Sequence, residues 1–344
     1  MSSQIIKAVI LVGGYGTRLR PFTFTTPKPL IPFANEPILK HQIRALSNSG
    51  VKEIILAMNY KTNKIKKAVE TFEKEFNIKI IFSIEDEVLN TGGPIGLVKE
   101  RLKNCLFFVL NADVICNFPL KEMINFHKKH EKMCTILTTK TETPERFGVL
   151  KITDNLVTGF FEKPKVFKGN DINAGIYIFS SNSLDLFEAK NISIETEVFP
   201  KISEKFELMS FPLIGYWKDI GQPKDFLLAQ KLFLEEKMKF NKNLMVKNNN
   251  LDSEKNVVVG ENVEIGVNFH AKDSTIMQNT KIGNNVVIEN SIIGPYCILE
   301  DNTVIKDLCL LGDGVKVKEC SKLTRVIACP FKTINSSEEN KIIL

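Results

Sequence analysis

The chain has 344 residues, a length at which a single hydrophobic core usually gives way to two domains. Hydrophobic residues make up 43% of the chain and charged residues 25%, as in an ordinary soluble globular protein. The formal net charge of +6 is mild, and Lys and Arg are interleaved with Asp and Glu. This charge could help to gather anionic substrates, but it is too weak to indicate nucleic-acid binding.

Seven cysteines are scattered along the chain without a Cys-x-x-Cys pair, which argues against zinc or redox chemistry. An odd number of cysteines without a signal sequence is typical of a reducing compartment. The N-terminus leads directly into the first predicted strand, and no apolar run approaches the ~20 residues that span a bilayer. We therefore expect a cytoplasmic protein with no membrane or nucleic-acid partner.

A glycine-rich stretch near the N-terminus predicts a nucleotide site. The apolar run 9–12 predicts a buried strand, and Gly13, Gly14 and Gly16 follow it. Glycine accepts positive φ and lets other groups approach the main chain, so the amides of residues 13–17 can converge on a phosphate. Arg18 would add positive charge there. The spacing fits neither the P-loop nor the dinucleotide fingerprint, and a purely structural turn is the alternative.

The continuation of this stretch carries a family resemblance. Gly-Gly-Tyr-Gly-Thr-Arg-Leu-Arg-Pro at 13–21, followed by Thr-Pro-Lys-Pro at 26–29, resembles the signature of the sugar-phosphate nucleotidyltransferases. The resemblance implies a Rossmann-like α/β domain with a mixed, mainly parallel sheet. It also implies that Arg18 and Lys28 hold the β- and γ-phosphates of a nucleotide. The implied nucleotide contacts in this part of the chain are Leu11, Gly13, Gly14, Gly16 and Thr17.

Short apolar runs alternate with longer helical patterns in the first two-thirds of the chain. We predict a helix over Glu36–Ser49, a strand over Val51–Met58, a helix over Lys61–Glu75 and a strand over Ile78–Phe82. This alternation indicates an α/β sheet of mainly parallel strands. Ligands of such sheets collect at the carboxyl ends of the strands, which is where chemistry is expected.

Acidic residues follow the strand that ends near Phe82. Glu85 and Asp86 could lie in a solvated loop, but a carboxylate there could accept from guanine N1–H and N2–H₂. The segment resembles the Glu-Glu-x-Leu-Gly-Thr-Ala-Gly-Pro stretch of the mannose-1-phosphate guanylyltransferases, which lies beside the base. Asn90 stands where that pattern has Gly, and Gly92 where it has Ala. Glu85 or Asp86 is thus the expected guanine reader, with Thr91, Gly93 and Asn111 as further nucleotide contacts.

A metal site is expected after the apolar strand 106–110. Asp113 lies just past the end of this strand, where a carboxylate needs a partner such as a cation. Mg²⁺ needs only one or two carboxylates together with phosphate oxygens and water. The family resemblance makes Asp113 a metal ligand, and Asp219 in Trp-Lys-Asp-Ile-Gly is the expected second carboxylate.

Four residues are expected to hold the sugar phosphate. Gly148 could mark a strand bulge, but the family's Tyr/Phe-Gly pair implies that a sugar ring lies against its backbone. Glu162 would accept from two sugar hydroxyls, and Lys163 would face the sugar phosphate as a point charge. Asn173 is expected to be another hydroxyl partner. Lys163 joins Arg18 and Lys28 as the residues expected to act on the reacting phosphates.

Other polar positions carry no assigned chemistry. Ser-Ile-Glu-Thr-Glu-Val-Phe at 193–199 predicts a helix start with a capping acid, and its likeness to a family run assigns it no role. Trp217 is expected to pack in the fold. The four histidines have no place in the expected chemistry and are interpreted as structural.

The last third of the chain has a different period. Aliphatic residues, often followed by Gly, recur in steps of six from residue 259 to residue 323, the hexapeptide pattern of a parallel β-helix. The steps lose phase between 271 and 282 and between 288 and 293, where we expect loops or bulges. The predicted domains are a catalytic domain at 1–236, a linker at 237–252 and a left-handed parallel β-helix at 253–344.

The chain as a whole resembles the mannose-1-phosphate guanylyltransferases, in particular their catalytic, beta-type subunits. The resemblance implies transfer of GMP from GTP to mannose 1-phosphate with Mg²⁺. The alternatives are a nucleotidyltransferase with another base or sugar, or a non-catalytic regulatory subunit. Arg18, Lys28, Asp113 and Asp219 are all present, which favours the catalytic interpretation. Because a β-helix has open ends, we expect a homo-oligomer or a complex with a homologous regulatory subunit.

Overall fold

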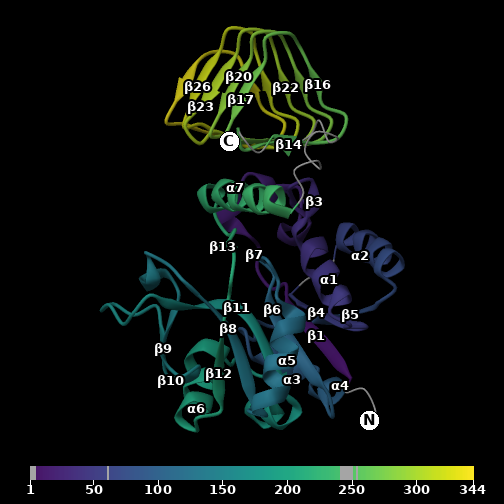
Figure 1. Ribbon diagram of the computed structural model, residues 1–344. Helices are drawn as coiled ribbons and strands as arrows, with labels where there is room; N and C mark the ends of the chain where they lie inside the picture. Colours follow the sequence, from purple (N-terminus) through teal and green to yellow (C-terminus); the bar gives the residue numbers. More distant parts are fainter. Residues whose placement is uncertain (1–4, 60–61, 241–250, 253–254) are drawn as a thin grey trace. The chain divides into compact units, whose positions relative to one another are not determined.

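The computed structural model describes residues 5–59, 62–240, 251–252 and 255–344. The chain forms two compact units, the first from residues 1–14 and 39–217 and the second from residues 15–38 and 218–344. Figure 1 gives the labels of their helices and strands. Most of the expected linker lies outside the described residues, and the domain boundaries at 236 and 252 remain a prediction.

A nine-stranded mixed sheet forms the centre of the first unit (Figure 1), in the order β5-β4-β1-β6-β11-β8-β12-β10-β9. In chain order its strands are β1 (Ile6–Leu11), β4 (Glu53–Met58), β5 (Lys79–Ile84), β6 (Leu106–Asn111), β8 (Cys134–Lys140), β9 (Gly148–Thr153), β10 (Leu156–Glu162), β11 (Asp171–Ser180) and β12 (Leu208–Pro212). Strands β5, β4, β1 and β6 run parallel, as does β12 with β8. The pairings of β11 with β6 and β8 and of β10 with β9 and β12 are antiparallel. The predicted mixed α/β sheet is confirmed.

The elements between the strands agree with the expected alternation. They are α1 (Ile38–Asn48), α2 (Asn63–Phe76), α3 (Gly93–Leu97), α4 (Lys99–Leu102), β7 (Val114–Cys116), α5 (Leu120–His130), η4 (Pro144–Arg146), η5 (Ser181–Leu186), the π-helical turn η6 (Ile194–Val198) and α6 (Phe199–Glu204). The expected helix at 61–75 is α2, whose N-cap Thr62 accepts a hydrogen bond from Ile65 N at 3.2 Å. Residue 61 lies outside the described residues.

The first helix begins two residues later than we predict from the sequence. Glu36–Pro37 forms β3, which pairs with β2 (Pro32–Phe33) in a hairpin. The two residues between these strands, Ala34 and Asn35, have φ of +48° and +67°. Two successive positive φ angles are the geometry of a type I′ hairpin turn. The helix α1 therefore begins only at Ile38.

Both faces of the sheet are buried. Val9, Ile55 and Val109 share one hydrophobic cluster with residues of α3 and α6. Ala8 and Ile10, which alternate with Val9 along β1, are fully buried as well. The apolar strands therefore read as continuous hydrophobic runs, and polar side chains gather at the strand ends.

The second unit combines the segment after the glycines with the C-terminal part of the chain. It contains η1 (Thr17–Leu19), η2 (Phe22–Phe24), η3 (Lys28–Leu30), the β2–β3 hairpin, the helix α7 (Pro223–Phe240) and the strands from β14 onward. The chain passes into this unit for the second time within β13 (Trp217–Asp219). The ring of Phe33 meets the rings of Phe226 and Phe233 of α7 edge-on, at 5.3 and 5.6 Å.

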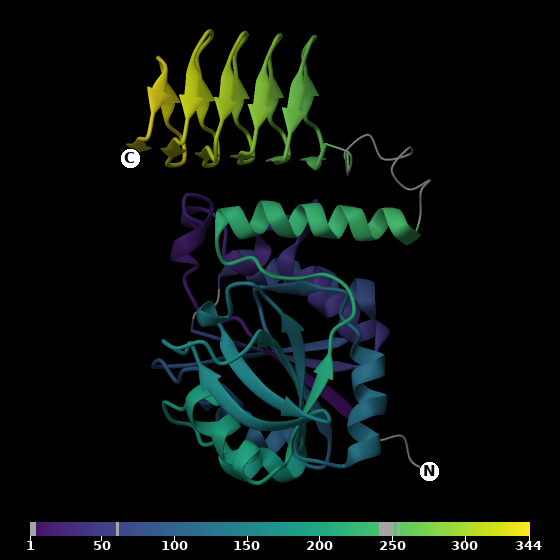
Figure 2. The ribbon, with the colours of Figure 1, turned by 60° about the vertical axis from the view of Figure 1, so that its left-hand side comes forward.

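A parallel β-helix forms the end of the chain, as predicted (Figure 2). Its first sheet holds β14 (Leu251–Asp252), β15 (Val257–Val259), β18 (Ser274–Ile276), β21 (Ile292–Ile293), β24 (Leu310–Leu311), β27 (Ile327–Ala328) and β30 (Ile342–Ile343). The second holds β16 (Glu264–Ile265), β19 (Lys281–Ile282), β22 (Ile298–Leu299), β25 (Lys316–Val317) and β28 (Thr333–Ile334). The third holds β17 (His270–Lys272), β20 (Val287–Glu289), β23 (Val304–Lys306), β26 (Lys322–Thr324) and β29 (Glu338–Glu339). The predicted inward aliphatic residues from Ile282 to Leu323 are buried, whereas Ile265 on the first coil is 46% exposed.

The expected loops at the phase changes are wrong. The steps from Ala271 to Ile276 and from Ile288 to Ile293 are five residues long, and each turns at one residue of positive φ, Asp273 or Asn290. The corresponding step in the next coil has six residues and two of positive φ, Asp307 and Leu308. The phase changes are therefore tight corners, one residue shorter than the hexapeptide step.

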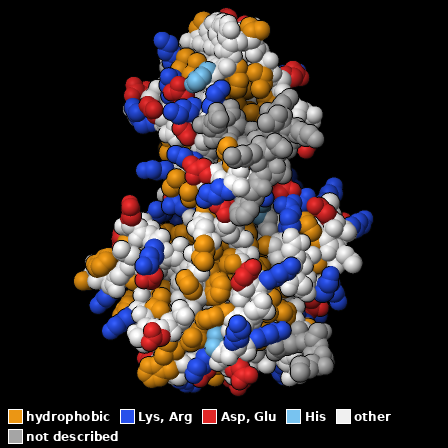
Figure 3. Space-filling model, viewed as in Figure 1, with side chains coloured by type: hydrophobic (Ala, Val, Ile, Leu, Met, Phe, Trp, Pro, Cys, Tyr) orange, Lys and Arg blue, Asp and Glu red, His pale blue; other side chains and the backbone are white. Residues whose placement is uncertain are grey.

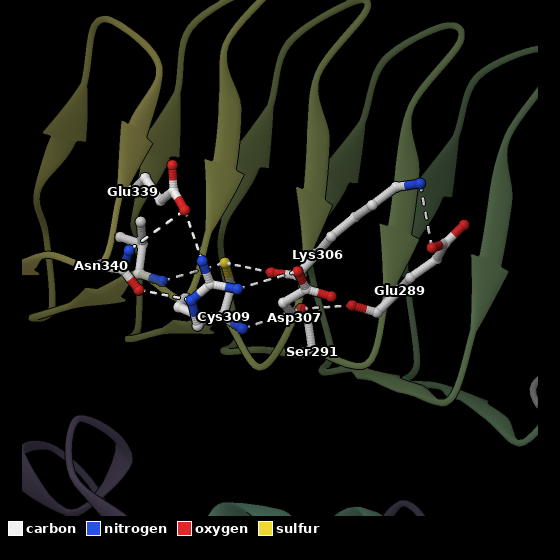
Figure 4. Close-up of polar contacts among 9 residues, drawn as sticks. Glu289, Ser291, Lys306, Asp307, Cys309, Glu339 and Asn340 are labelled. Atoms are coloured by element: carbon white, nitrogen blue, oxygen red, sulfur yellow. Dashed lines mark hydrogen bonds and ion pairs between the residues drawn. The ribbon is translucent and has the colours of Figure 1, made fainter.

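Side chains stack along this corner (Figure 4). Ser291 Oγ donates to Glu289 O at 2.8 Å and accepts from the amide of Cys309 at 3.1 Å. Cys309 Sγ repeats the pattern one coil further by donating to Lys306 O at 3.1 Å. The ladder thereby pairs main-chain groups at the ends of β20 and β23 and the amide of Cys309.

The surface carries both charge signs. Figure 3 shows Lys and Arg side chains interspersed with Asp and Glu over the visible face, in agreement with their interleaving along the sequence. None of the helices among the described residues is both long and apolar enough to cross a membrane.

Candidate active site

The carboxyl ends of the parallel strands meet at one edge of the sheet in the first unit. Leu11, the last residue of β1, pairs with Ala57 of β4 on one side and with Asn111 of β6 on the other. Gly13 lies two residues after the end of β1, and Glu85 directly follows β5. The strand order therefore brings these expected nucleotide residues to the same edge.

Glu85 faces the glycine stretch. A β-carbon built on Gly13 would lie 2.8 Å from Asn59 Oδ1 and 3.9 Å from Glu85 Oε1. Glu85 is 6% exposed and accepts a hydrogen bond from Leu89 N at 3.1 Å, and burial raises the pKa of its carboxyl. Asp86 is exposed to solvent. Of the two candidate guanine readers, Glu85 is the one beside Gly13.

The loop at 90–93 is held by glycine and Asn geometry. Asn90 has φ of +60°, a conformation that Asn adopts more readily than most residues, so it can stand where the family pattern has Gly. Gly92 donates its amide to Ile192 O at 2.8 Å. A β-carbon on Gly93 would collide with the carbonyl of Lys190, so only glycine fits there.

Thr91 connects this loop to the segment 193–197. Its hydroxyl donates to Glu195 Oε2 at 2.6 Å and accepts from the amide of Ile194 at 2.9 Å. Ser193, the predicted helix start, accepts from Thr196 N at 3.1 Å and caps η6. The only hydroxyl proton of Thr91 is thus directed at Glu195.

The expected metal ligand Asp113 lies two residues after the end of β6 and is half-buried. The neighbouring main chain is held by Gln42, whose amide donates to Asn111 O at 2.8 Å and to Val114 O at 3.1 Å. The side-chain nitrogen of Asn111 lies 2.9 Å from the position of a β-carbon on Gly175. The sequence places the carboxylate here by ending an apolar strand at a polar turn.

The expected sugar residues gather where β10 and β11 pass β9. Glu162 pairs with Gly148 across the β9–β10 ladder, and its Oε2 lies 2.9 Å from the position of a β-carbon on that glycine. Lys163 Nζ lies 3.3 Å from Glu162 Oε1. Burial raises the pKa of the Glu162 carboxyl, while the Lys163 ammonium opposes the shift. The glycine therefore leaves space directly in front of a half-buried carboxylate.

Asn173 is fixed from two sides. Its Oδ1 accepts from the amide of Gly175 and its Nδ2 donates to Tyr177 Oη, both at 2.8 Å. The register of β11 shifts between Asn173 and Tyr177, which lets both side chains meet. Trp217 packs nearby, as predicted, with its ring nitrogen donating to Ala174 O at 2.9 Å. Sequence reasoning missed Tyr177 because it reads as a buried strand residue.

The remaining expected residues belong to the second unit. Gly16, with φ of +62°, forms the N-cap of η1, in which Thr17 and Arg18 lie exposed. A β-carbon on Gly16 would lie 3.0 Å from Lys28 Cβ, so this lysine packs against the turn. A β-carbon on Gly221 would lie 2.8 Å from both Arg18 Nη2 and Asp219 Oδ1.

Arg18 and Asp219 are thus neighbours within the second unit, although two hundred residues separate them in the sequence. Asp219 Oδ1 also accepts from the amide of Gly221 at 2.7 Å. Across the described residues, no group of three or more His, Cys, Asp and Glu side chains forms a metal-binding cluster. Carboxylate oxygens such as those of Asp113 and Asp219 are the donors that Mg²⁺ prefers.

Comparison with protein families identifies the fold of this site. The model of the nucleotidyl transferase family matches residues 7–236. The chain belongs to this family. A second family model, the GMPPB C-terminal domain, matches residues 229–343. Nucleotidyl transferases generally use a divalent metal ion, which fits the carboxylates at the strand ends.

Named relatives support the assignment. A Saccharomyces cerevisiae protein named mannose-1-phosphate guanyltransferase is 50% identical over 233 residues, which cover 66% of this chain and 64% of that protein. A Drosophila melanogaster protein named mannose-1-phosphate guanylyltransferase catalytic subunit beta is 49% identical over 230 residues, which cover 66% of this chain and 62% of that protein. These alignments span less than two thirds of the length of the relatives.

Solved structures agree with the fold of the nucleotidyl transferase part. HddC from Yersinia pseudotuberculosis superposes with a TM-score of 0.55 at 31% identity, covering 65% of this chain and 97% of that one. A Bacillus anthracis protein crystallised in complex with a sucrose gives a TM-score of 0.59 at 22% identity, covering 65% and 93%. The second likeness supports the fold alone.

Proposed function

We propose that this nucleotidyl transferase transfers GMP from GTP to mannose 1-phosphate, giving GDP-mannose and pyrophosphate. The observation that carries the proposal is the identity of about half the aligned residues with relatives named for this reaction. The burial of Glu85 beside Gly13 supports a guanine nucleotide, because a carboxylate matches the N1–H and N2–H₂ donors of that base. Asp86, in the same loop, is the second candidate for this role.

The chemistry needs positioning more than proton transfer. The attacking group is a phosphate oxygen that is already anionic, so no general base is required. The difficulty is to bring two anions together and to stabilise the departing pyrophosphate. We propose that Arg18 and Lys28, with main-chain amides of Gly13, Gly14, Gly16 and Thr17, hold the β- and γ-phosphates.

The remaining proposed roles follow the two clusters of the first unit. Leu11, Thr91, Gly93 and Asn111 would line the nucleotide subsite around Glu85. Glu162, Asn173 and the main chain at Gly148 would bind the hexose. Lys163 would hold the sugar phosphate in line with the α-phosphate, as a point charge.

We propose Mg²⁺ as the divalent ion, with Asp113 and Asp219 as its protein ligands. When bound, Mg²⁺ supplies electrostatic stabilisation of the charge that develops on the phosphate oxygens. The two aspartates would leave most of its coordination positions to phosphate and water, as Mg²⁺ prefers.

The proposed partners and location follow from the β-helix and from the cysteines. We propose that the β-helix mediates a homo-oligomer or a complex with a homologous regulatory subunit, because its open ends present unpaired strands. We also propose a cytoplasmic location, since all seven cysteines are free thiols.

Pyrophosphate release tests the proposal. Purified protein with mannose 1-phosphate is expected to release pyrophosphate with GTP and not with UTP, dTTP or ATP. Asp113→Ala should lower the rate by about 100-fold or more, since it removes an electrostatic group of the transition state. Glu142→Ala, at an exposed position outside the proposed site, is the control and should leave the rate unchanged.

The alternatives predict other results. Preference for another nucleotide would contradict Glu85 as a guanine reader, and preference for another hexose phosphate would contradict mannose 1-phosphate. No release with any pair would favour the regulatory-subunit alternative, and a partner chain would be the next thing to seek.

A further inference from the structure

Glu195 occupies a position that the proposed chemistry does not use. It is the second residue of η6 and is half-buried. Its Oε2 accepts hydrogen bonds from two hydroxyls, Thr91 Oγ1 at 2.6 Å and Ser193 Oγ at 3.1 Å. Its Oε1 accepts no hydrogen bond from the described residues. This atom is not among the buried, unpaired side-chain atoms of the described residues, so it is accessible. One oxygen of this carboxylate is thus fixed and the other is available.

The surroundings of Glu195 are the proposed hexose subsite. The elements η6 and β10, which ends at Glu162, contact each other. The ring of Phe199, at the start of α6, packs against Tyr177 at 4.9 Å between ring centroids. Tyr177 in turn accepts from Asn173. Contacts of η6 with β10 and with α6 therefore bring the segment of Glu195 near the strands that carry Glu162 and Asn173.

Electrostatics agree with this proximity. Burial raises the pKa of the Tyr177 hydroxyl, and the next cause in order of size is the negative charge of Glu195. The same charge adds to the rise of the Glu162 pKa. The Lys163 ammonium beside Glu162 offsets part of this repulsion, and further hydrogen-bond donors would stabilise both carboxylates. The hydroxyls of a hexose are such donors.

A purely structural role is already filled by a neighbour. Glu197 Oε1 accepts from the amide of Ser193 at 3.0 Å, and Ser193 Oγ caps the turn. These two contacts satisfy the start of the helical segment without Glu195. Glu195 is therefore not needed as a cap of this helical segment.

We propose that Glu195 is a second hexose-binding carboxylate, which accepts a sugar hydroxyl through the oxygen that Thr91 and Ser193 leave open. Thr91 is then the positioning residue that holds this carboxylate. Together, Glu162 and Glu195 bind different hydroxyls of the ring and make the site selective for the configuration of the sugar. The inference rests on the proposed function, because it names a specificity residue of the same site.

The test uses Glu195→Gln with mannose 1-phosphate and its 2-, 3-, 4- and 6-deoxy analogues. Glutamine keeps the shape of the side chain and removes its charge. We expect the KM for mannose 1-phosphate to rise about tenfold or more, because a hydrogen bond to a charged group is lost. The KM for GTP should change by less than about twofold.

The analogue series supplies the decisive readout. With one of the deoxy analogues, kcat/KM of the wild type should be about tenfold lower than with mannose 1-phosphate. The same analogue should lower kcat/KM of Glu195→Gln only slightly, because the hydroxyl that it lacks is the partner of Glu195. Thr91→Val should reduce that coupling, and Thr91→Ser should restore it. Glu197→Gln is the matched control and should behave as wild type, because its amide oxygen can still accept from Ser193.

Each other result is decisive as well. The proposal would be overturned if Glu195→Gln lowered kcat/KM by the same factor with all four analogues. An unchanged KM for mannose 1-phosphate in this variant would overturn it as well. If the wild type releases no pyrophosphate with this substrate pair, the proposed function fails, and calorimetric titration with hexose 1-phosphates takes the place of kinetics. Weaker binding by Glu195→Gln than by Glu197→Gln would then support the inference, and equal binding or none would overturn it.

Discussion

At the scale of single residues, two histidines of α5 form a closed relay of hydrogen bonds. His130 Nδ1 accepts from Lys132 N, so its Nε2 must carry the proton and donate to Thr135 Oγ1 at 2.7 Å. Ser180 Oγ donates to Lys132 O, so it accepts from His127 Nε2 at 2.8 Å. Thr135 then donates to His127 Nδ1 at 2.8 Å. Every proton is assigned when both rings are neutral.

This relay predicts a loss of stability in acid. Burial, with His130 nearby, lowers the pKa of His127 to about 3. Below the unfolded value near 6.5, the unfolded chain binds a proton that the folded chain does not. The free energy of unfolding should therefore fall by about 2 kcal/mol between pH 6.5 and pH 5 from this residue. Urea denaturation at both pH values measures it.

His127→Gln provides the control for this prediction. Glutamine does not titrate, so the variant should be less stable at pH 7 but lose about 2 kcal/mol less on acidification. An equal loss in both proteins would show that other groups cause the acid sensitivity.

At the scale of elements, the corners of the β-helix depend on residues in the left-handed region. Asn290 turns a five-residue corner with φ of +44°, and its main-chain N–H donates to Lys272 O at 2.9 Å. Its side chain is exposed. The backbone conformation is therefore the main contribution of this residue.

Asn290→Ala should lower the free energy of unfolding by about 1 kcal/mol, because alanine adopts positive φ at a higher cost than Asn. Asn290→Gly keeps the conformation accessible and should be close to neutral. Thermal denaturation of both variants measures the difference. Equal stability of the two variants would contradict the strain argument.

The sequence predicts elements well where their signals are local. Apolar runs predict β4, β5 and β6 to within two residues and β1 to within three, because a buried parallel strand needs a continuous hydrophobic run. The start of α1 is wrong because the positive φ of Ala34 and Asn35 makes a hairpin that propensity does not reveal. The corners at Asp273 and Asn290 are missed for the same reason.

At the scale of the whole molecule, the second unit joins distant parts of the chain. Gln230 of α7 is fully buried and donates to Asn256 O at 3.1 Å and to Ser274 O at 3.2 Å. Its carbonyl accepts from Thr275 Oγ1. Asn35 of the N-terminal hairpin donates to Val259 O at 2.8 Å. The hairpin, α7 and the first coils of the β-helix are thus directly connected.

Gln230→Leu should lower the free energy of unfolding by about 3 kcal/mol. Leucine has a similar size but leaves the buried hydroxyl of Thr275 without its acceptor, at a cost of about 1–3 kcal/mol for an unsatisfied buried group. It also removes one donor each from Asn256 O, which keeps the amide of Ser274, and from Ser274 O. Gln222→Leu, at a half-buried position with no side-chain hydrogen bond among the described residues, should change it by less than about 0.5 kcal/mol. Scanning calorimetry compares them, and similar melting temperatures would contradict the connecting role of Gln230.

The candidate site is predictable from the sequence only in part. Glycines and carboxylates after apolar strands identify Gly13, Glu85 and Asp113, because the strand ends of a parallel sheet share one edge. Glu195 and Tyr177 could not be found in this way. Their role depends on contacts between segments about a hundred residues apart, such as Thr91 with Glu195, which no local pattern encodes.

The coil register of the β-helix restricts how this domain can change in length. Ile276 lies over Ile293 and Leu299 over Val317, so one coil takes seventeen or eighteen residues. A deletion of a few residues would turn the inward aliphatic positions of all later coils outward, whereas removal of one full period would keep every later position in place. Insertions, deletions and transfers between homologous domains should therefore involve whole coils.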